Sequence, residues 1–491
     1  MISLLNQSLW RTQLYIGGEW TDADSGHTFA VNNPATGAII AQVANGGASE
    51  TRRAIVAADI AQRKWKNAPA KTRSQLLRKW FDLVVENQED LAQILTLEQG
   101  KPLAEARREI AYGASYIEWF AEEAKRIYGD VIAPPDNGKR ILVLKQPVGV
   151  VAAITPWNFP NAMLARKLAP AVAAGCSIVV KPAAQTPLSA LALAVLAERA
   201  GIPAGVINIV CGEDVAAIGS ELTQHPALRK LSFTGSTAVG KKLLQQCAAG
   251  VKKVTMELGG NAPFIVFDDA DMDAAVAGAM ASKFRNSGQT CVCANRFYIQ
   301  AAVYDEFVAK ISRVMSEELI AGDGFVESTT LGPLISPVAV EKARGLVADA
   351  VARGAVRKEI GQFALAEGLA KEYFYPPTLL LDVPPDAALC NEELFAPVVA
   401  LIKFTHEEEV VALANATEFG LAAYFYSQNS ARIWRLAEQL EVGMVGVNEG
   451  IISNEMAPFG GIKQSGWGRE GSAYGMEDYV NIKYLCIGSI S

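Results

Sequence analysis

From Val148 onward, short β-rich runs alternate with helical segments, and this rhythm limits the possible folds more than any other feature of the chain. A buried strand predicted over Val148–Ile154 is followed by a helix over Ala162–Ala174, and the alternation continues to Cys247. A second series starts at Pro263–Phe267. Repeats of strand, helix and strand build parallel sheets that are covered by helices on both faces. The sequence therefore predicts an α/β protein with two doubly wound parallel-sheet domains.

The chain has 491 residues, which is too many for one ordinary core and agrees with more than one domain. Long helical patterns before residue 132 are expected to pack on the first sheet. We therefore assign residues 1–131 and 150–257 to the first α/β domain and residues 258–478 to the second.

Two segments fit neither series. Arg140–Gln146 alternates like a strand, and Tyr479–Ile487 is a predicted strand at the end of the chain. Each strand would leave an exposed edge unless it is paired. They could be edge strands within one subunit. Alternatively, residues 132–149 and 479–491 form a small β arm that pairs with another subunit and gives a homo-oligomer, a dimer or a tetramer.

The composition limits which kinds of partner the protein can bind and in which cellular compartment it is expected. The formal net charge of -7 offers no basic surface for nucleic acid or for an anionic membrane. The longest apolar runs are far shorter than a membrane span, and the N-terminus lacks the pattern of a signal peptide. The seven cysteines are scattered and odd in number, which indicates reduced thiols rather than a disulfide framework. A cytoplasmic protein is expected.

Residues suited to a nucleotide follow several strands of the first series. Asn158 follows the first strand and offers an amide donor suited to a developing oxyanion. Lys181 ends the next strand, and Gly235 and Gly240 stand where a later strand leads into a helix. Ligands bind at the carboxyl ends of strands in open α/β sheets, and a helix N-terminus attracts phosphate. Each residue alone also has an ordinary explanation, a helix cap for Asn158 and a solvated side chain for Lys181. Together they favour a Rossmann-like dinucleotide-binding domain.

Two further residues have reactive side chains. Cys291 lies on a polar turn between apolar segments, where a substrate can reach the thiol. Glu257 lies between apolar residues where the two series meet, and desolvation would raise its pKa and make it a general base, unless it is salt-bridged there. The chain has only three histidines, which argues against a cysteine–histidine hydrolase. Cys291 and Cys293 lack further ligands at zinc spacing, so no metal site is expected.

The order of these motifs along the chain resembles the aldehyde dehydrogenase superfamily, from Tyr15 to Tyr484. The matching motifs are Pro156–Pro160, Lys181–Ala183, Phe233–Ser236, Glu257–Gly260, Gly288–Cys291, Glu393–Phe395 and Pro458–Gly461. The narrower resemblance is to the succinate-semialdehyde dehydrogenase subfamily. It is carried by Ala281–Asn286, Cys291–Asn295, Ile452–Glu455 and Lys463–Gly466.

The resemblance implies a mechanism that uses three residues. Cys291 attacks the aldehyde carbon, and the Asn158 side chain and the Cys291 backbone N–H hold the oxyanion. A hydride leaves for the nicotinamide, and Glu257 activates the water that hydrolyses the thioester. Relatives that transfer the acyl group to coenzyme A generally lack this glutamate, so a free acid is the expected product. A non-catalytic dinucleotide-binding protein is expected to lack one of these three residues.

The resemblance also implies the cofactor. Relatives that prefer NAD often carry a glutamate at the position of Ala184, where it binds the adenosine ribose. Here that carboxylate is missing and Lys181 remains, so NADP is expected to be accepted and preferred over NAD. The family places these residues around the dinucleotide: Thr155, Pro156, Trp157, Lys181, Ala183, Ala184, Gly235, Ser236, Leu258, Glu393 and Phe395.

For the substrate, the subfamily binds a distal carboxylate with two arginines and a serine, which match Arg166, Arg285 and Ser453. Arginine–carboxylate bonds are strong and directional, so an ω-carboxylated aldehyde is expected, unless Arg285 is paired with an acidic residue of the chain. Succinate semialdehyde is the expected substrate, with glutarate semialdehyde or another semialdehyde as the alternative. Cys293 is either a packed neighbour or a redox partner of Cys291, the latter as the resemblance to some members of the subfamily implies.

Overall fold

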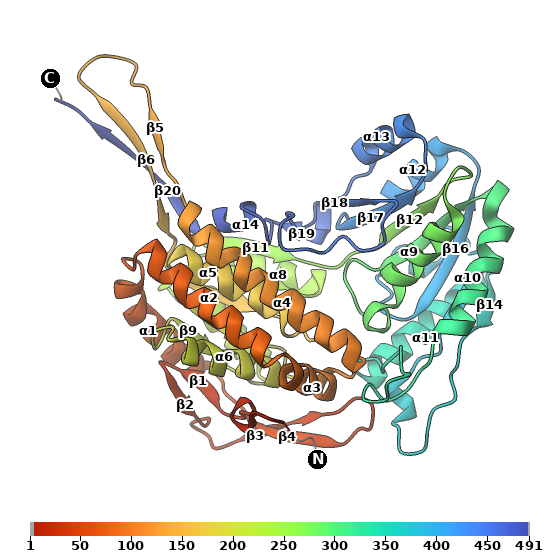
Figure 1. Cartoon of the computed structure of the whole chain (residues 1–491), viewed down its shortest axis with the longest axis horizontal. Coiled ribbons are helices and arrows are strands. Elements are labelled where there is room, and N and C mark those ends of the chain that lie inside the picture. The colour runs from red at the N-terminus through yellow and green to blue at the C-terminus, as the bar shows by residue number, and fades with distance from the viewer. Residues whose placement is uncertain (1–3, 490–491) are drawn as a thin grey trace.

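The computed structural model describes residues 4–489 and contains two α/β lobes and a projecting β arm (Figure 1). The first sheet has the strand order β19-β11-β10-β7-β8-β9-β1-β2. Strands β7 to β11 are parallel, whereas β1, β2 and β19 are antiparallel to their neighbours. The strands are β1 (Leu14–Ile16), β2 (Glu19–Thr21), β7 (Val150–Ile154), β8 (Ile178–Lys181), β9 (Ile207–Ile209), β10 (Leu228–Thr234), β11 (Lys253–Glu257) and β19 (Gly466–Trp467).

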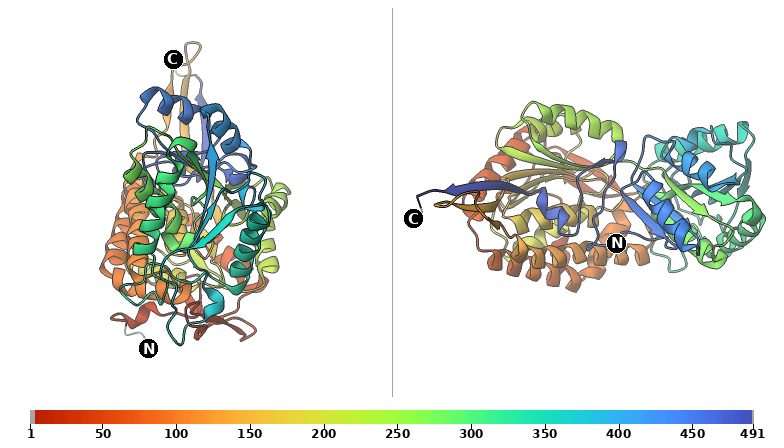
Figure 2. Two further views of the ribbon diagram at one scale, coloured as in Figure 1. Left: turned by 90° about the vertical axis from the view of Figure 1, so that its right-hand side faces the viewer. Right: turned by 90° about the horizontal axis from the view of Figure 1, so that it is seen from above.

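Helices cover both faces of the first sheet (Figure 2). One layer contains α5 and α6 with α2, α3 and α4 packed on them, and the other contains α1, α7 and α8. Because both faces are covered, β8 and β9 are buried along their whole length. The helices are α1 (Ala48–Trp65), α2 (Ala70–Glu86), α3 (Gln88–Gln99), α4 (Leu103–Glu123), α5 (Ala162–Ala174), α6 (Leu188–Ala200), α7 (Val215–Gln224) and α8 (Thr237–Ala248).

The second sheet has the order β14-β15-β16-β13-β12-β17-β18, and only β14 is antiparallel to its neighbour. Alternate residues of its strands serve two separate cores. Phe264 and Phe297 pack with α9 and α10, while Ile265 and Tyr298 pack with α11, α12 and α13. The elements are β12 (Ala262–Val266), α9 (Met272–Phe284), β13 (Ala294–Gln300), α10 (Tyr304–Glu318), α11 (Pro337–Ala352), β14 (Val356–Glu359), β15 (Thr378–Leu381), β16 (Val398–Phe404), α12 (Glu407–Asn415), β17 (Ala422–Tyr426), α13 (Ser430–Gln439) and β18 (Met444–Val447).

The projecting arm is a three-stranded antiparallel sheet of β5 (Asp130–Ile132), β6 (Arg140–Pro147) and β20 (Val480–Ile487). Strands β6 and β20 pair in continuous register, so the two segments that fitted neither series are partners within one subunit. The arm still exposes large apolar side chains, since Val131 is 80% and Ile482 is 74% exposed. A separate two-stranded sheet is formed by β3 (Thr28–Asn32) and β4 (Ile39–Ala44), near the N-terminus. A short helix, α14 (Tyr474–Glu477), precedes β20.

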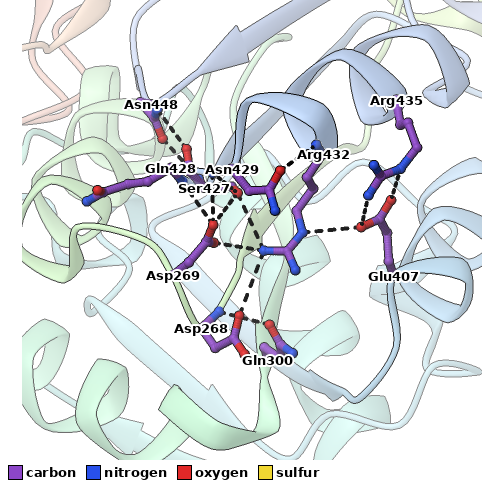
Figure 3. Close-up of polar contacts among 10 residues, drawn as sticks. All are labelled: Asp268, Asp269, Gln300, Glu407, Ser427, Gln428, Asn429, Arg432, Arg435 and Asn448. Carbon is purple, nitrogen blue, oxygen red and sulfur yellow. Dashed lines mark hydrogen bonds and ion pairs between the residues drawn. The ribbon is translucent and has the colours of Figure 1, made fainter.

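A polar network fills the carboxyl ends of β12 and β17 (Figure 3). Asp269 accepts hydrogen bonds from Ser427 Oγ and from the Asn429 N–H, each at 2.9 Å. Arg432 donates to Asp269 at 2.8 Å, and its guanidinium carbon lies 4.3 Å from the centre of the Phe267 ring. Open α/β sheets usually bind ligands at this edge, but here the protein's own side chains occupy it.

The α/β prediction with two doubly wound sheets is confirmed, and the two sheets are mixed at their edges rather than purely parallel. The domain ranges stay a prediction. Strand β19 falls within the predicted second range, 258–478, but pairs with β11 of the first sheet. The chain therefore returns to the first sheet after the strands of the second sheet are complete. No helix within residues 4–489 is long and apolar enough to cross a membrane.

Candidate active site

The predicted site residues meet between the two sheets. Strands β7, β10 and β11 end at the carboxyl edge of the first sheet, and the segments before β13 and β16 lead into the second. A cavity of about 280 Å³ lies between these ends. The predicted residues that line it are Pro156, Trp157, Asn158, Arg166, Gly235, Ser236, Glu257, Leu258, Arg285, Cys291, Glu393, Phe395 and Ser453.

Four predicted cofactor residues do not line this cavity: Thr155, Lys181, Ala183 and Ala184. The Thr155 N–H donates to the Lys181 carbonyl at 3.1 Å, which places both residues at adjoining ends of β7 and β8. Lys181 is 5% exposed, and its Nζ donates to the Pro182 carbonyl at 3.2 Å. Burial lowers the pKa of Lys181. These residues can meet a ligand that extends along the strand ends beyond the cavity.

Cys291 follows a strained turn. Asn286 and Ser287 have φ values of 52° and 55°, in the left-handed region that non-glycine residues rarely adopt. Gly288 has φ of 81°, and a Cβ there would lie 2.3 Å from the Ala396 carbonyl oxygen. Glycine is therefore required at 288, and the turn is held against the segment before β16. Burial raises the pKa of the Cys291 thiol to about 12, so the thiol needs help to ionise.

The Asn158 side chain points to the turn that carries Cys291. Its Nδ2 donates to the Gln289 carbonyl at 3.0 Å, and its buried Oδ1 has no partner among the described residues. The N-cap of α5 is Asn161, so Asn158 does not cap that helix. An amide donor thus stands next to the Cys291 turn, where an oxyanion would form.

Glu257 is 2% exposed, and neither carboxyl oxygen has a hydrogen-bond partner within residues 4–489. No ion pair joins Glu257 in this part of the chain, in contrast to the salt-bridged alternative. Burial, and next the charge of Glu470, raise the pKa of Glu257 well above its usual range. A carboxyl group in this state can take a proton near neutral or alkaline pH.

Arg166 and Arg285 stand on the same cavity. Arg166 is 1% exposed and forms an ion pair with Glu470 through Nε, while both terminal nitrogens lack hydrogen-bond partners in the described chain. Arg285 forms no ion pair among residues 4–489, and its guanidinium carbon lies 5.1 Å from the centre of the Phe159 ring. The alternative that an acidic residue of the chain pairs with Arg285 does not occur in this structure. Ser453 completes the set.

No motif in the sequence points to Glu470 or Lys167. Both side chains are at most 4% exposed, and Lys167 also pairs with Glu470, which is therefore held between two cations. Burial alone would raise the pKa of Glu470, but Arg166 and Lys167 lower it overall. No local motif surrounds these residues, and only their contact in three dimensions reveals them.

The cavity fits a dinucleotide in several respects. Helix α8 begins after Ser236, whose side chain does not cap it, so the first N–H groups of the helix are available to a phosphate. A Cβ at Gly240 would lie 2.4 Å from Leu258. Glu393 accepts from the Gly260 N–H at 3.1 Å, and burial raises its pKa to about 7. The rings of Trp157 and Phe395 meet edge to face at 5.8 Å.

The two neighbouring thiols have different surroundings. Cys291 lines the cavity, whereas Cys293 is 2% exposed and its Sγ donates to the Lys283 carbonyl at 3.5 Å. Both are free thiols in this structure. Within the described residues, no group of three or more His, Cys, Asp or Glu side chains is arranged to hold a metal ion.

The chain is similar to known proteins over nearly its whole length. The profile of the aldehyde dehydrogenase family matches residues 20–485. A glutarate-semialdehyde dehydrogenase of Pseudomonas aeruginosa is 58% identical over 100% of both chains. The NADP(+) succinate-semialdehyde dehydrogenase of Escherichia coli K12 is 57% identical over 99% of this chain and 100% of its own. A crystal structure of succinate-semialdehyde dehydrogenase from Burkholderia pseudomallei has a TM-score of 0.96 and 59% identity over 99% of this chain and 100% of that one. The chain belongs to the aldehyde dehydrogenase family, whose members use NAD(P)+.

Proposed function

We propose that this enzyme oxidises an ω-carboxylated aldehyde, succinate semialdehyde, to the free dicarboxylate with NAD(P)+ and water. One observation carries the proposal. Buried, unpartnered polar atoms of Arg166 and Glu257 line the same cavity as Cys291 and the Asn158 amide. Buried polar groups without partners are rare in folded proteins, and they are expected where a ligand supplies the missing partner.

In the proposed mechanism Cys291 first loses its thiol proton to solvent. The thiolate sulfur then bonds to the aldehyde carbon, and the carbonyl electron pair moves to oxygen. The Asn158 Nδ2 and the Cys291 backbone N–H stabilise this oxyanion. When bound, NAD(P)+ supplies the hydride acceptor that turns the adduct into a thioester. Glu257 then takes a proton from water, the water oxygen bonds to the thioester carbon, and the carbon–sulfur bond breaks. The products are the acid and the regenerated Cys291.

The far end of the substrate is assigned to Arg166, Arg285 and Ser453. Charge-assisted bonds to two guanidinium groups select a carboxylate over an uncharged group. The cavity of about 280 Å³ suits a short chain between the reactive carbon and this carboxylate. Glutarate semialdehyde is the second candidate, and it is favoured by a relative of that name at 58% identity.

We further propose that NADP is preferred over NAD. Ala184 offers no carboxylate to the adenosine ribose, and Lys181 offers a cation beside it. The NADP(+) enzyme of Escherichia coli at 57% identity supports this choice. Of the two lobes, residues 1–131 with 150–257 would bind the dinucleotide, and residues 258–478 would carry the nucleophile.

The arm of residues 132–149 and 479–491 is proposed to join subunits in a homo-oligomer, a dimer or a tetramer. Exposed apolar side chains on β5 and β20 support this role, because they would be covered by a partner. The seven free thiols support a reducing compartment, the cytoplasm. Light scattering on the purified enzyme measures the oligomer directly.

The experiment that tests the function is a steady-state assay that follows absorbance of the reduced nicotinamide. Succinate semialdehyde, glutarate semialdehyde and butanal are compared with both cofactors. The highest kcat/KM is expected for succinate semialdehyde with NADP. A higher value for butanal would overturn the proposed substrate class.

A further inference from the structure

A buried ion pair lies beneath the turn that carries Asn158. Lys101, just before α4, and Glu109, on α4, have side chains that are each 1% exposed. Lys101 Nζ lies 2.5 Å from Glu109 Oε2. Removing two charges from water is costly, and further contacts must compensate for it. Neither residue lines the cavity of Cys291, so the proposed mechanism does not use either of them.

Those further contacts are made with residues 158–162. Lys101 Nζ donates to the backbone carbonyl of Asn158 at 2.8 Å and lies 3.9 Å from the centre of the Phe159 ring. Glu109 Oε1 accepts from the Asn161 N–H at 2.9 Å and from the Ala162 N–H at 3.3 Å. Lys101 therefore holds the start of the turn at Asn158, and Glu109 holds its end at Asn161 and Ala162, where α5 begins.

The same turn is joined to the Cys291 turn. Asn286 Nδ2 donates to the Asn158 carbonyl at 2.8 Å and to the Gln289 carbonyl at 3.3 Å. The Gln289 carbonyl is also the acceptor of Asn158 Nδ2. The backbone and the side chain of Asn158 are thus fixed by separate partners, and Lys101 supplies one of the two donors to its backbone carbonyl.

We infer that Lys101 and Glu109 are positioning residues for the oxyanion amide: they hold the backbone of residues 158–162 so that Asn158 Nδ2 stays beside the Cys291 turn. This inference rests on the proposed role of Asn158. A preorganised donor needs no rearrangement as charge develops, and a displacement of about 1 Å can cost about 100-fold in rate. If the Asn158 amide were free to move, the buried Lys101–Glu109 pair would not contribute to the rate in this way.

Lys101→Met keeps most of the side-chain volume and removes the charge and the donor. We expect it to lower kcat for succinate semialdehyde about 10- to 100-fold, with KM within about threefold of wild type. Glu109→Gln keeps an oxygen acceptor for the Asn161 N–H but replaces the oxygen that faces Lys101 with an amide NH2. It breaks the ion pair while the turn keeps its N–H contacts, so a smaller loss in kcat is expected. If Lys101→Met does not fold, Glu109→Gln carries the same test.

The readout that separates positioning from general structure is a double-mutant cycle. In an Asn158→Ala background, Lys101→Met should lower kcat by less than about threefold, because the amide it positions is gone. NADP+ binding and alkylation of Cys291 by iodoacetamide do not use the amide and should match wild type. Arg107→Met is the control, since Arg107 lies on α4 as Glu109 does and its loss removes a charge from an exposed pair with Glu89 of α3.

The outcomes distinguish this inference from the proposed function. Losses that multiply in the double variant, or wild-type kcat in both Lys101→Met and Glu109→Gln, would overturn the positioning role while leaving the proposed function intact. A loss in Arg107→Met equal to that in Lys101→Met would also overturn it. Wild-type kcat in Asn158→Ala alone would instead overturn the proposed role of the amide itself.

Discussion

The Nε of Arg166 is ion-paired with Glu470, and this contact fixes the direction in which the guanidinium can bind a ligand. Both terminal nitrogens remain buried and without hydrogen-bond partners among residues 4–489. Arg285 stands at a different point of the wall, where the cavity adjoins a larger one of about 1000 Å³. We therefore take Arg166 as the fixed part of the proposed carboxylate site and Arg285 as the part that can be replaced with little risk to the fold.

Arg285→Ala should raise KM for succinate semialdehyde about 10- to 100-fold, because a charge-assisted bond contributes about 1.5–3 kcal/mol. KM for butanal, which lacks the carboxylate, should stay within about threefold. Arg313→Ala is the matched control, since Arg313 is exposed and lines only the larger cavity. Equal losses for both aldehydes would contradict the assignment of Arg285.

The hydrolysis step should accelerate as pH rises. Burial raises the pKa of Glu257, so the carboxyl is protonated at low pH and becomes a base only as pH passes that raised value. Cys291 also ionises more at high pH, but it acts before the thioester forms. Stopped-flow kinetics separates the two steps. The burst of reduced nicotinamide in the first turnover reports on Cys291, and the steady-state rate that follows reports on Glu257. A steady-state rate in Glu257→Gln that keeps the wild-type value and pH profile would count against the base.

Ala184→Glu should shift cofactor use toward NAD. A carboxylate at this position would bind the ribose hydroxyls of NAD and repel the 2′-phosphate of NADP. The ratio of kcat/KM for NAD to that for NADP is expected to rise about tenfold or more. Gln185→Glu adds the same charge one residue further on, at an exposed side chain, and should change the ratio less. An unchanged ratio in Ala184→Glu would show that this position does not set the preference.

Cys293 provides a test of redox control. If peroxide joins Cys293 to Cys291, activity is lost and dithiothreitol restores it. In Cys293→Ala the resolving thiol is absent, so the reductant should no longer rescue the oxidised enzyme. Rescue of Cys293→Ala to the wild-type extent would leave Cys293 as a packed neighbour only, as its contact with the Lys283 carbonyl would allow.

Much of the fold follows from local patterns. The helix predicted over Ala162–Ala174 coincides with α5, because its apolar residues and the following left-handed Gly175 are local signals. Within the long helical patterns before residue 132, α2 and α3 are separate helices, since Asn87 leaves the helical conformation between them. Strands β1, β2 and β19 have only two or three residues and are too short to show a period.

Site residues that belong to a distinctive sequence motif could be predicted from the sequence. Those that matter only through contacts in the folded structure could not. Cys291, Glu257 and Asn158 stand in distinctive segments, and the structure brings them to one cavity. Glu470 and Lys101 have no distinctive neighbours in the sequence. Their importance comes from the residues they meet across more than fifty positions, which no local pattern contains.

The most direct test of the proposed mechanism is mass spectrometry of Glu257→Gln after acid quenching during turnover of succinate semialdehyde with NADP+. Loss of the base should slow hydrolysis, so the thioester should accumulate as a succinyl group on the peptide that contains Cys291. Cys291→Ala in the same background should carry no adduct. Absence of the succinyl group from Glu257→Gln while reduced nicotinamide still forms, or its presence on another residue, would contradict covalent catalysis by Cys291.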